Sequence, residues 1–305
     1  MKLSEECFNK VKKDCFKFIK SQETSTEKFG NKKGMIKNFL IPICFWIAKK
    51  ADNKKPYFVG LAGGQGTGKT TTSSIIKIIL EKYFKLKVFK ISIDDFYKTR
   101  KERMTLSKKV HPMLLTRGVP GTHDINMMLD FFKRIKRKKF RSLKLPKFNK
   151  VTDDRYNKKS WYSLKKKPDI IIFEGWCVGA KAEKNNTLKK SVNSMEKLKD
   201  TKLTWRSYVN EQLKTKYKQL YDQLNCLLYI KSSNFTLLKK WRIKQEKKLM
   251  LKNKKSNNFK IMSDKEVINF MQTYQRVTQN MFKNVPKYAS IILYLNSNHQ
   301  IKSVV

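Results

Sequence analysis

Five short runs of mostly apolar residues occur along the chain, separated by longer and more polar stretches. Such runs, rich in β-branched and aromatic side chains, are typical of strands that are buried on both faces of a parallel sheet. We predict a strand at each of them. They lie at 57–62, 88–93, 170–173, 226–230 and 290–295.

Helical spacing of apolar residues follows most of these runs. The last helical segment opens on the capping-box pattern S-D-K-E. Because strands alternate with helices, we predict an α/β fold with a mostly parallel central sheet that helices cover on both faces. The predicted helices are 69–83, 125–138, 205–224, 234–252 and 264–282.

The N-terminal residues 1–55 are Lys-rich and helical in spacing, and no linker divides the chain into independent domains. The apolar block 39–48 would be unfavourable in water, so we expect it to pack on the main domain. We therefore predict an N-terminal helical extension at 1–37 and one main domain at 38–305.

Three stretches lack a clear periodicity. Residues 98–123 contain several Pro and Gly breakers and 146–167 is irregular, so both are predicted to be loops. Residues 181–200 are polar and poor in apolar side chains, which predicts an insertion or a mobile surface loop.

The chain carries 70 Lys and Arg against 24 Asp and Glu, a net charge of +46. A charge of this size attracts nucleic acids and anionic membranes. The basic residues are, however, spread over the whole sequence, and Lys greatly outnumbers Arg, the residue that forms bidentate pairs with bases and phosphates. We attribute the charge to Lys-rich solvated faces and expect no specific nucleic-acid partner.

No apolar run reaches the roughly 18 residues that a membrane span requires, and the N-terminus lacks the apolar region of a signal peptide. The five cysteines form no C-x-x-C pair, and their odd number argues against a disulfide framework. The three histidines lie far from any paired cysteines, so no zinc pattern is present. We expect a protein of the reducing cytoplasm with no membrane partner.

The strongest chemical signal is G-G-Q-G-T-G-K-T at 63–70, which fits the phosphate-loop pattern G-x-x-x-x-G-K-[ST] between a predicted strand and a predicted helix. Glycine lets backbone N–H groups approach the phosphates, and the helix directs its positive end at the anion. Lys69 would reach the terminal phosphates, and Thr70 would place its hydroxyl on Mg²⁺. The predicted nucleotide-binding residues are Gly63, Gly64, Gln65, Gly66, Thr67, Gly68, Lys69, Thr70 and Thr71.

Carboxylates end two of the predicted strands, Asp94 and Asp95 the second strand and Glu174 the third. The carboxyl ends of parallel strands meet at one edge of a sheet, so we expect these acids to converge with Lys69. Phosphoryl transfer needs charge neutralisation, alignment and a group that accepts the proton of the acceptor hydroxyl. We predict that Asp94 accepts the proton of the acceptor hydroxyl. Glu174, together with Thr70, is predicted to bind Mg²⁺. For the two aspartates, ordinary turn chemistry is the alternative.

Several segments, in the expected order, resemble motifs of the D-glycerate 3-kinase group of P-loop kinases, which is related to uridine kinase, pantothenate kinase and phosphoribulokinase. The likeness spans about 38–295 and implies the three-layer P-loop kinase fold with a helical lid. The segments are G-L-A-G-G-Q-G-T-G-K-T (60–70), S-I-D-D-F-Y (92–97), R-G-V-P-G-T-H-D (117–124), F-E-G-W-C-V-G (173–179), W-R-I-K-Q-E (241–246) and M-S-D-K-E-V (262–267).

The resemblance implies ATP and Mg²⁺ as cofactors and transfer of the γ-phosphoryl group to a hydroxyl of a small acceptor, with D-glycerate the first to try. Asp94 then matches the catalytic base of the wider group, beside Lys69 of the phosphate loop. Arg242 matches a basic position in the helical lid, although neighbouring lysines show that its helix also has an ordinary solvated face. Asn149 departs from the group, which often has Asp at this position. The difference affects which acceptor is expected and leaves the expected reaction type unchanged.

Residues for the acceptor are assigned on both sides of the predicted base. In the acceptor segment of the group, Asp124 could equally be the N-cap of the following helix, and His123 a loop histidine satisfied within the protein. Arg155 could pair with an acceptor carboxylate or be surface charge. The predicted acceptor-binding residues are Asp95, Tyr97, Arg117, His123, Asp124 and Arg155.

Other functions stay open from the sequence. A kinase of a different acceptor, such as a nucleoside or a pantothenate-like alcohol, would use the same site. A nucleic-acid-binding P-loop NTPase would use the positive charge, but it would ordinarily show an Arg-rich or aromatic-interleaved face, which we do not find. A non-catalytic ATP-binding protein is disfavoured by the intact Lys69, Thr70, Asp94 and Glu174. The oligomeric state does not follow from the sequence.

Overall fold

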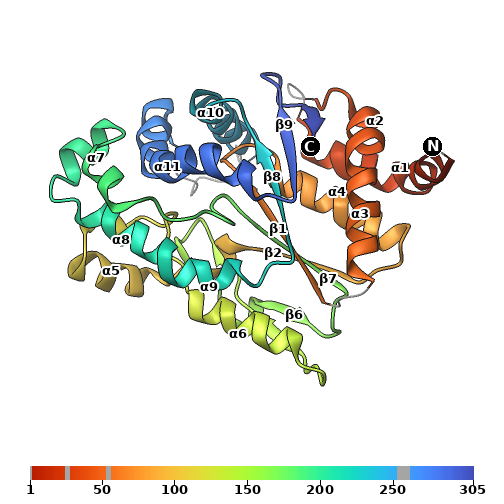
Figure 1. The fold of residues 1–305 in the computed structure, drawn as a ribbon, viewed down its shortest axis with the longest axis horizontal. Helices are drawn as coiled ribbons and strands as arrows, with labels where there is room; N and C mark the ends of the chain where they lie inside the picture. Colours follow the sequence, from red (N-terminus) through yellow and green to blue (C-terminus); the bar gives the residue numbers. More distant parts are fainter. Residues whose placement is uncertain (1, 25–27, 53–55, 253–261) are drawn as a thin grey trace.

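The computed structural model describes residues 2–24, 28–52, 56–252 and 262–305. Its centre is a six-stranded sheet with the order β10-β9-β8-β1-β7-β2 (Figure 1). The neighbouring strands run parallel except for β10, which is antiparallel to β9. In sheet order the strands are β10 (Ile301–Val304), β9 (Ile291–Leu295), β8 (Cys226–Lys231), β1 (Tyr57–Gly63), β7 (Ile170–Gly175) and β2 (Val88–Ser92).

Two inner strands of the sheet, β1 and β7, explain why the sequence shows unbroken apolar runs. Every residue of β1 and of β7 is buried. Strands with helices on both faces have no solvent side, so their hydrophobicity does not alternate. The strands predicted from the apolar runs are confirmed as β1, β2, β7, β8 and β9. The edge strand β10 lies outside the predicted elements because its residues are only half-buried or exposed and form no apolar run.

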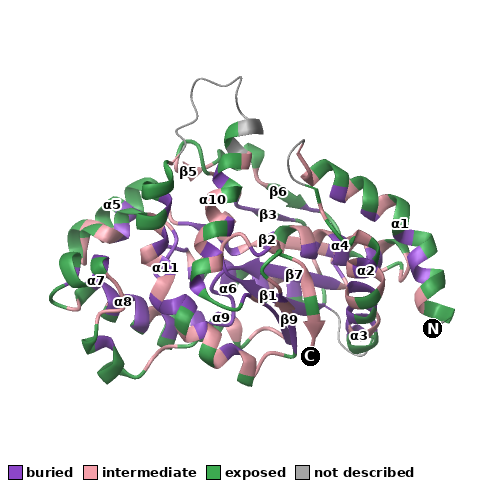
Figure 2. Cartoon of the chain, turned by 90° about the horizontal axis from the view of Figure 1, so that it is seen from above, coloured by how far each residue is buried: buried purple, intermediate pink, exposed green. Residues whose placement is uncertain are grey.

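Helices cover both faces of the sheet. α4 (Lys69–Lys82) packs against β1, β2 and β7, while α6 (Ile125–Lys136) lies on the opposite side (Figure 1). Phe132 of α6 stacks on Phe58 of β1, with the ring centroids 4.7 Å apart. Figure 2 shows buried residues gathered in the strands and exposed residues on the outer helices. The predicted three-layer α/β fold is confirmed.

The N-terminal segment is helical, as predicted. Cys44 is fully buried there, and its thiol lies 3.8 Å from the carbonyl oxygen of Ile76 in α4. The apolar block 39–48 therefore packs on the main domain, while the boundary at residue 37 stays a prediction. On the α4 side of the molecule lie α1 (Lys2–Gln22), α2 (Lys32–Gly34), the π-helical η1 (Met35–Leu40) and α3 (Ile41–Ala51) (Figure 1).

The prediction of a loop at 98–123 is wrong in part, because the segment contains the helix α5 (Arg100–Lys109) and the 3₁₀ turn η3 (Pro112–Leu115). The buried residue of α5 is Arg103, which is fully enclosed. Its guanidinium donates to the Asp153 carbonyl oxygen at 2.6 Å and pairs with the Asp153 carboxylate at 3.0 Å. A helix anchored by a buried cation has no apolar stripe for a sequence pattern to detect.

The segment predicted as irregular, 146–167, takes part in two short antiparallel pairs. Strands of two or three residues are too short for an alternating pattern to show in the sequence. The elements are β3 (Leu143–Leu145) with β6 (Tyr162–Leu164), β4 (Phe148–Asn149) with β5 (Asp154–Arg155), and the 3₁₀ turn η4 (Lys158–Ser160).

The predicted helix 205–224 is divided by a π-helical turn. Such a turn changes the face on which the following side chains lie. Two further predicted helices are confirmed as α10 (Phe235–Lys252) and α11 (Asp264–Asn284). The divided helix consists of α8 (Thr204–Gln212), the π turn η6 (Leu213–Tyr217) and α9 (Lys218–Tyr221).

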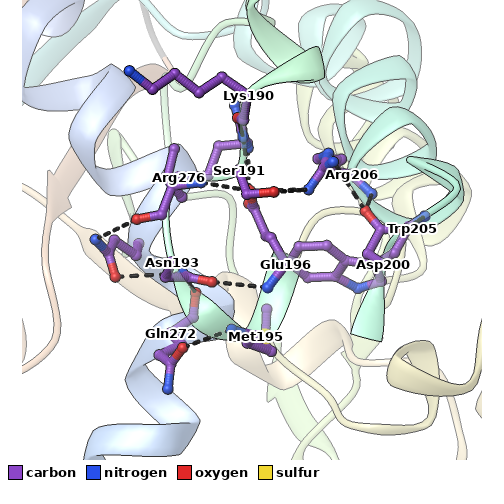
Figure 3. A network of polar contacts seen from close by, with 12 residues as sticks. Lys190, Ser191, Asn193, Met195, Glu196, Asp200, Trp205, Arg206, Gln272 and Arg276 are labelled. Carbon is purple, nitrogen blue, oxygen red and sulfur yellow. Dashed lines mark hydrogen bonds and ion pairs between the residues drawn. The ribbon is translucent and has the colours of Figure 1, made fainter. Parts of the chain in front are cut away.

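The segment 181–200 is not wholly the surface loop that its composition predicts. It contains α7 (Ser194–Lys199), in which Glu196 is fully buried. Glu196 pairs with Arg276 of α11 at 2.7 Å and with Arg206 of α8 at 3.3 Å (Figure 3). Polar residues of this segment thus form buried ion pairs. Composition alone does not tell such residues from polar residues that are exposed to solvent.

Among the described residues, no helix combines the length and the apolar character needed to cross a membrane. All five cysteines are buried and free of disulfides. The remaining short 3₁₀ turns are η2 (Ile93–Phe96), η5 (Asn185–Lys189) and η7 (Val285–Lys287).

Candidate active site

The phosphate loop joins the buried strand β1 to helix α4. Gly66 and Gly68 adopt φ angles of +78° and +84°, a region of backbone space that residues with a Cβ disfavour. Because α4 begins at Lys69, the unpaired N–H groups of its first turn, which includes Thr71, lie directly after the loop. The segment therefore has the backbone geometry of an anion-binding cradle.

Lys69 folds back over this loop. Its ammonium donates a hydrogen bond to the Gly64 carbonyl oxygen at 2.9 Å, and the Thr67 hydroxyl donates to the same oxygen at 2.9 Å. Burial lowers the pKa of Lys69, and the negative charges of Glu174 and Asp94 oppose that shift. The structure thus places both acids close enough to Lys69 for their charges to act on it.

Gln65 lies in the middle of the loop. Its amide oxygen and nitrogen are both buried, and neither has a hydrogen-bond partner among the described residues. A buried amide without partners is costly in a protein, so its place in a phosphate loop fits a group that a ligand satisfies.

The carboxylate of Glu174 lies at the end of β7 and faces the first turn of α4. The Thr70 hydroxyl donates to Glu174 Oε1 at 3.0 Å, and the Ser73 hydroxyl donates to Oε2 at 2.5 Å. Mg²⁺ takes oxygen ligands and is usually held by one or two protein groups together with phosphate oxygens. Thr70 and Glu174 fit that role.

Asp94 follows β2, in the 3₁₀ turn η2. Lys150 donates to Asp94 Oδ2 at 3.0 Å, and the Tyr97 hydroxyl donates to Oδ1 at 3.0 Å. Burial acts to raise the pKa of Asp94, but the charge and hydrogen bond of Lys150, with the charge of Lys69, outweigh it and leave the pKa at about 2. The carboxylate is therefore ionised at neutral pH.

Asp95 has the opposite electrostatic character. Burial and the neighbouring charge of Asp94 raise its pKa to about 6, although a hydrogen bond from the Phe148 amide at 3.4 Å opposes that shift. Both carboxyl groups are mostly ionised at neutral pH, but Asp95 takes up a proton near pH 6, whereas Asp94 does so only in strong acid. The Asp95 carboxylate accepts the Phe148 amide and thereby supports the hairpin there.

Arg155 and Asp124 form an ion pair next to the backbone of Tyr97. Arg155 donates to Asp124 Oδ2 at 3.1 Å and to the Tyr97 carbonyl oxygen at 2.7 Å. Asp124 also caps α6, because its carboxylate accepts the Met127 amide at 3.1 Å. Asp124 is therefore the N-cap of α6, and with Arg155 it ties the backbone of Tyr97 to that helix. Acceptor binding by these two residues stays a prediction.

Arg117 is partly exposed and lies beside the hairpin that carries Lys150. It forms an ion pair with Asp153, and its guanidinium lies over the Phe148 ring, 5.5 Å from the centroid. Arg117 is therefore a predicted acceptor residue whose positive charge is accessible from solvent.

His123 is buried on the other side of Tyr97. Its ring stacks on the Tyr97 ring with centroids 4.4 Å apart, and Nδ1 lies 2.6 Å from the Tyr217 hydroxyl. Its Nε2 is buried without a hydrogen-bond partner among the described residues. Burial lowers the pKa of His123 to about 3, so the ring is neutral.

Helix α10 packs directly on the phosphate loop. A Cβ at Gly66 would come within 3.0 Å of the Trp241 backbone and 3.3 Å of the Arg242 nitrogen, so only glycine allows this approach. Arg242 is 14% exposed and pairs with Glu246 at 2.6 Å, without the angles of a hydrogen bond. The helix is therefore placed as a lid, with the Arg242 side chain turned toward its own helix.

Some residues of the site escape sequence reasoning. Lys150 contacts Asp94 from a hairpin whose strands are too short to predict, and Ser73 shares Glu174 with Thr70. The spacing of Thr70 and Ser73 along a helix is the signal that points to Ser73, since both then lie on one helical face. Tyr217 reaches the site from a π turn, which no sequence pattern indicates.

Comparisons with known proteins agree with this geometry. No protein-family model matches the chain. The uncharacterized kinase mug58 of Schizosaccharomyces pombe is 28% identical over 228 residues, which cover 72% of this chain and 79% of that protein. The chloroplastic D-glycerate 3-kinase of Arabidopsis thaliana is 25% identical over 260 residues, which cover 79% of this chain and 53% of the plant protein.

Solved structures share the architecture. D-glycerate 3-kinase from Cryptococcus neoformans superposes with a TM-score of 0.73 at 22% identity, covering 89% of this chain and 98% of that one. This likeness confirms the P-loop kinase fold. The relatives confirm the resemblance to D-glycerate 3-kinases that the sequence motifs indicate, and they support a phosphotransferase.

Proposed function

We propose that this protein is an ATP-dependent kinase that transfers the γ-phosphoryl group of ATP to a hydroxyl of D-glycerate. The observation that carries the proposal is the convergence of Lys69, Asp94 and Glu174 at one edge of the sheet, beside a complete phosphate loop. The similarity to the plant D-glycerate 3-kinase supports both the reaction and the acceptor.

The nucleotide side of the site is formed by the loop and the first turn of α4. Backbone N–H groups after β1 would bind the phosphates, and Lys69 would leave the Gly64 carbonyl to contact the terminal phosphate oxygens. Thr70 and Glu174 would hold Mg²⁺, which neutralises charge on the phosphate oxygens when it is bound. The lid cation Arg242 would approach the transferred group if its ion pair with Glu246 opens.

Asp94 is the proposed acceptor for the proton of the substrate hydroxyl. A carboxylate with a pKa of about 2 is a weak base, so it acts first by orienting the hydroxyl through a charge-assisted hydrogen bond. The loose transition state of phosphoryl transfer demands little proton removal before the phosphoryl group moves. A weak but fully ionised base is sufficient for this chemistry.

A small hydroxy acid fits the charges around Asp94. On its hairpin side lie an exposed cation, Lys150, and a partly exposed one, Arg117, with side-chain exposures of 62% and 28%. They can pair with a substrate carboxylate while Asp94 holds the hydroxyl. Arg155 is committed to Asp124 and Tyr97, so we assign it to holding the acceptor segment rather than to contacting the substrate.

The proposal is tested by incubating the purified protein with ATP and Mg²⁺ and a panel of D-glycerate, L-glycerate, uridine and pantothenate, with ADP release and product mass as readouts. We expect release of ADP and a monophosphorylated product with D-glycerate, and loss of both when EDTA removes the metal. Lys69→Ala should abolish turnover, whereas Lys82→Ala, an exposed lysine of the same helix, should not. Stimulation by DNA or RNA with no acceptor dependence would contradict the proposal.

We also propose that the protein acts in a reducing, cytoplasmic setting on a small molecule. Five buried, free cysteines support this setting, because none of them is available for a structural disulfide.

A further inference from the structure

The hydroxyl of Tyr217 makes two contacts with the acceptor segment. Tyr217 is fully buried at the end of the π turn η6. Its hydroxyl accepts the Gly121 amide at 2.9 Å and lies 2.6 Å from His123 Nδ1. π turns occur often at functional sites, because they turn a side chain toward a place that a regular helix would not reach.

These contacts decide which nitrogen of His123 carries the proton. The Gly121 amide can only donate, so the Tyr217 oxygen is an acceptor there and has its own proton free to give. If that proton goes to Nδ1, the ring carries its hydrogen on Nε2, and every group of the cluster except the Nε2–H is satisfied. If Nδ1 carried the hydrogen instead, the phenol proton and Nε2 would both be left without partners, at a higher cost.

The imidazole ring is held neutral by its surroundings. Burial lowers the pKa of His123 to about 3; the charge of Asp94 acts to raise it and that of Lys98 to lower it. The aromatic neighbours Tyr97 and Tyr217 bring no charge, because burial raises the pKa of each phenol well above its usual value.

The unpaired Nε2 belongs to a ring that lies beside the catalytic carboxylate. His123 forms a β-bridge with Tyr97 and stacks on its ring, and the Tyr97 hydroxyl donates to Asp94 at 3.0 Å. Nε2 is buried in a residue that is 1% exposed, and it has no partner among the described residues. A buried donor left unpaired next to a reaction centre fits a group whose partner is the substrate.

We propose that Tyr217 is a positioning residue, which fixes His123 as the neutral Nε2–H tautomer so that this N–H donates a hydrogen bond to an oxygen of the phosphoryl acceptor. The inference rests on the proposed kinase function. A neutral donor has a specific advantage here: a charged imidazolium would pair with Asp94 and compete with the acceptor hydroxyl for it. The site thereby favours an acceptor with a second oxygen near the reacting hydroxyl, as in a hydroxy acid or a diol.

The tautomer can be read directly by two-bond ¹H–¹⁵N correlation spectroscopy of the labelled protein, because the chain has only three histidines. His123→Gln identifies the signal. We expect the Nε2–H pattern, unchanged between about pH 5 and pH 8. An Nδ1–H pattern, or titration within that range, would overturn the inference whether or not the protein is a kinase.

Tyr217→Phe tests the positioning role. We expect the pure Nε2–H pattern of His123 to be lost and the KM for the acceptor to rise about tenfold, with the KM for ATP unchanged. The matched control is Tyr221→Phe on α9, which removes a half-buried hydroxyl that contacts the Cys177 sulfur instead of the acceptor segment. An equal effect of both variants, or a rise in the KM for ATP alone, would contradict the inference.

Two further measurements keep the test decisive if Tyr217→Phe does not fold. Adding D-glycerate to the wild-type protein should shift the Nε2–H resonance of His123, and an unperturbed resonance in the presence of saturating acceptor would overturn the inference. His123→Gln, which keeps an N–H donor, should retain more acceptor affinity than His123→Phe, which removes it. Absence of phosphorylation with every acceptor would instead count against the kinase function, leaving the tautomer result to stand separately.

Discussion

Lys150 donates a hydrogen bond to Asp94 at 3.0 Å, from the hairpin between β4 and β5 to the end of β2. The pair couples the proposed base to a lysine whose side chain is 62% exposed. An exposed ammonium can leave its partner at small cost, because water solvates it in either position. With a pKa of about 2, Asp94 is ionised before the substrate binds. It can then exchange its hydrogen bond from Lys150 for one from the acceptor hydroxyl.

We predict that Lys150→Ala shifts the acidic limb of the pH–rate profile to higher pH. Lys150 is the strongest of the groups that lower the pKa of Asp94, so its loss raises that pKa toward the value that burial favours. Asp94 must be ionised to accept a proton, and the active fraction then declines at a higher pH. The measurement is kcat/KM against pH, with the exposed Lys144→Ala as control, and an unchanged acidic limb would show that Lys150 does not act on the base.

Asp94→Asn removes the proton acceptor and keeps the size of the side chain. We expect kcat to fall by about 10²- to 10⁴-fold, the usual contribution of a general base, while ATP binding changes little. Single-turnover kinetics together with a nucleotide-binding assay separate the two effects. Asp130→Asn, on the exposed face of α6, is the matched control, and wild-type turnover in Asp94→Asn would remove Asp94 from the base role.

Asp95 makes the stability of the protein depend on pH. Its folded pKa of about 6 lies above the unfolded value, so the folded state binds the extra proton and stability falls as pH rises from about 4 to 6. Asp95→Asn imitates the protonated form, and we expect it to exceed the wild type in free energy of unfolding by on the order of 3 kcal/mol above pH 7 and by little near pH 4. Urea unfolding at both pH values checks this. A difference independent of pH would contradict it, and Asp222→Asn at an exposed site should show none.

The ion pairs around Glu196 should be important for stability rather than for catalysis. Glu196 and Arg206 are 0% and 3% exposed, and Arg276 is 6% exposed, so the cluster in Figure 3 is shielded from water. Glu196→Gln leaves two buried guanidinium groups with less compensating charge, and we expect a loss of about 3 to 5 kcal/mol in the free energy of unfolding. Chemical denaturation measures it against Glu211→Gln on the exposed side of α8, and a loss below about 1 kcal/mol would show that the pairs are replaceable.

The sequence predicts those parts of the site that depend on backbone chemistry. β1 and β7 are recognisable because burial on both faces leaves continuous apolar runs, with Glu174 only near the end of β7. The phosphate loop is recognisable by its glycines, of which Gly66 and Gly68 have positive φ. The placement of Asp94 and Glu174 follows from the same strands, since parallel strands end at one edge. These features are local in the sequence or follow from topology alone.

Other parts of the structure depend on contacts between distant segments, which a single sequence does not display. α5 is held by the buried cation Arg103 instead of an apolar stripe, although its capping box at Thr99 and Glu102 was a usable signal. Lys150 reaches Asp94 across 56 positions, and Tyr217 reaches His123 across 94. No spacing rule links such residues, because their proximity results from the packed fold.

A crystal structure with Mg²⁺ and a non-hydrolysable ATP analogue tests most directly the placement of the nucleotide opposite the base. We expect the β-phosphate to accept hydrogen bonds from the amides of residues 64–70, the metal to contact Thr70 and Glu174, and Asp94 to face the terminal phosphate across the space for the acceptor. A nucleotide bound elsewhere, or an Asp94 carboxylate directed away from the terminal phosphate, would contradict the proposed reaction.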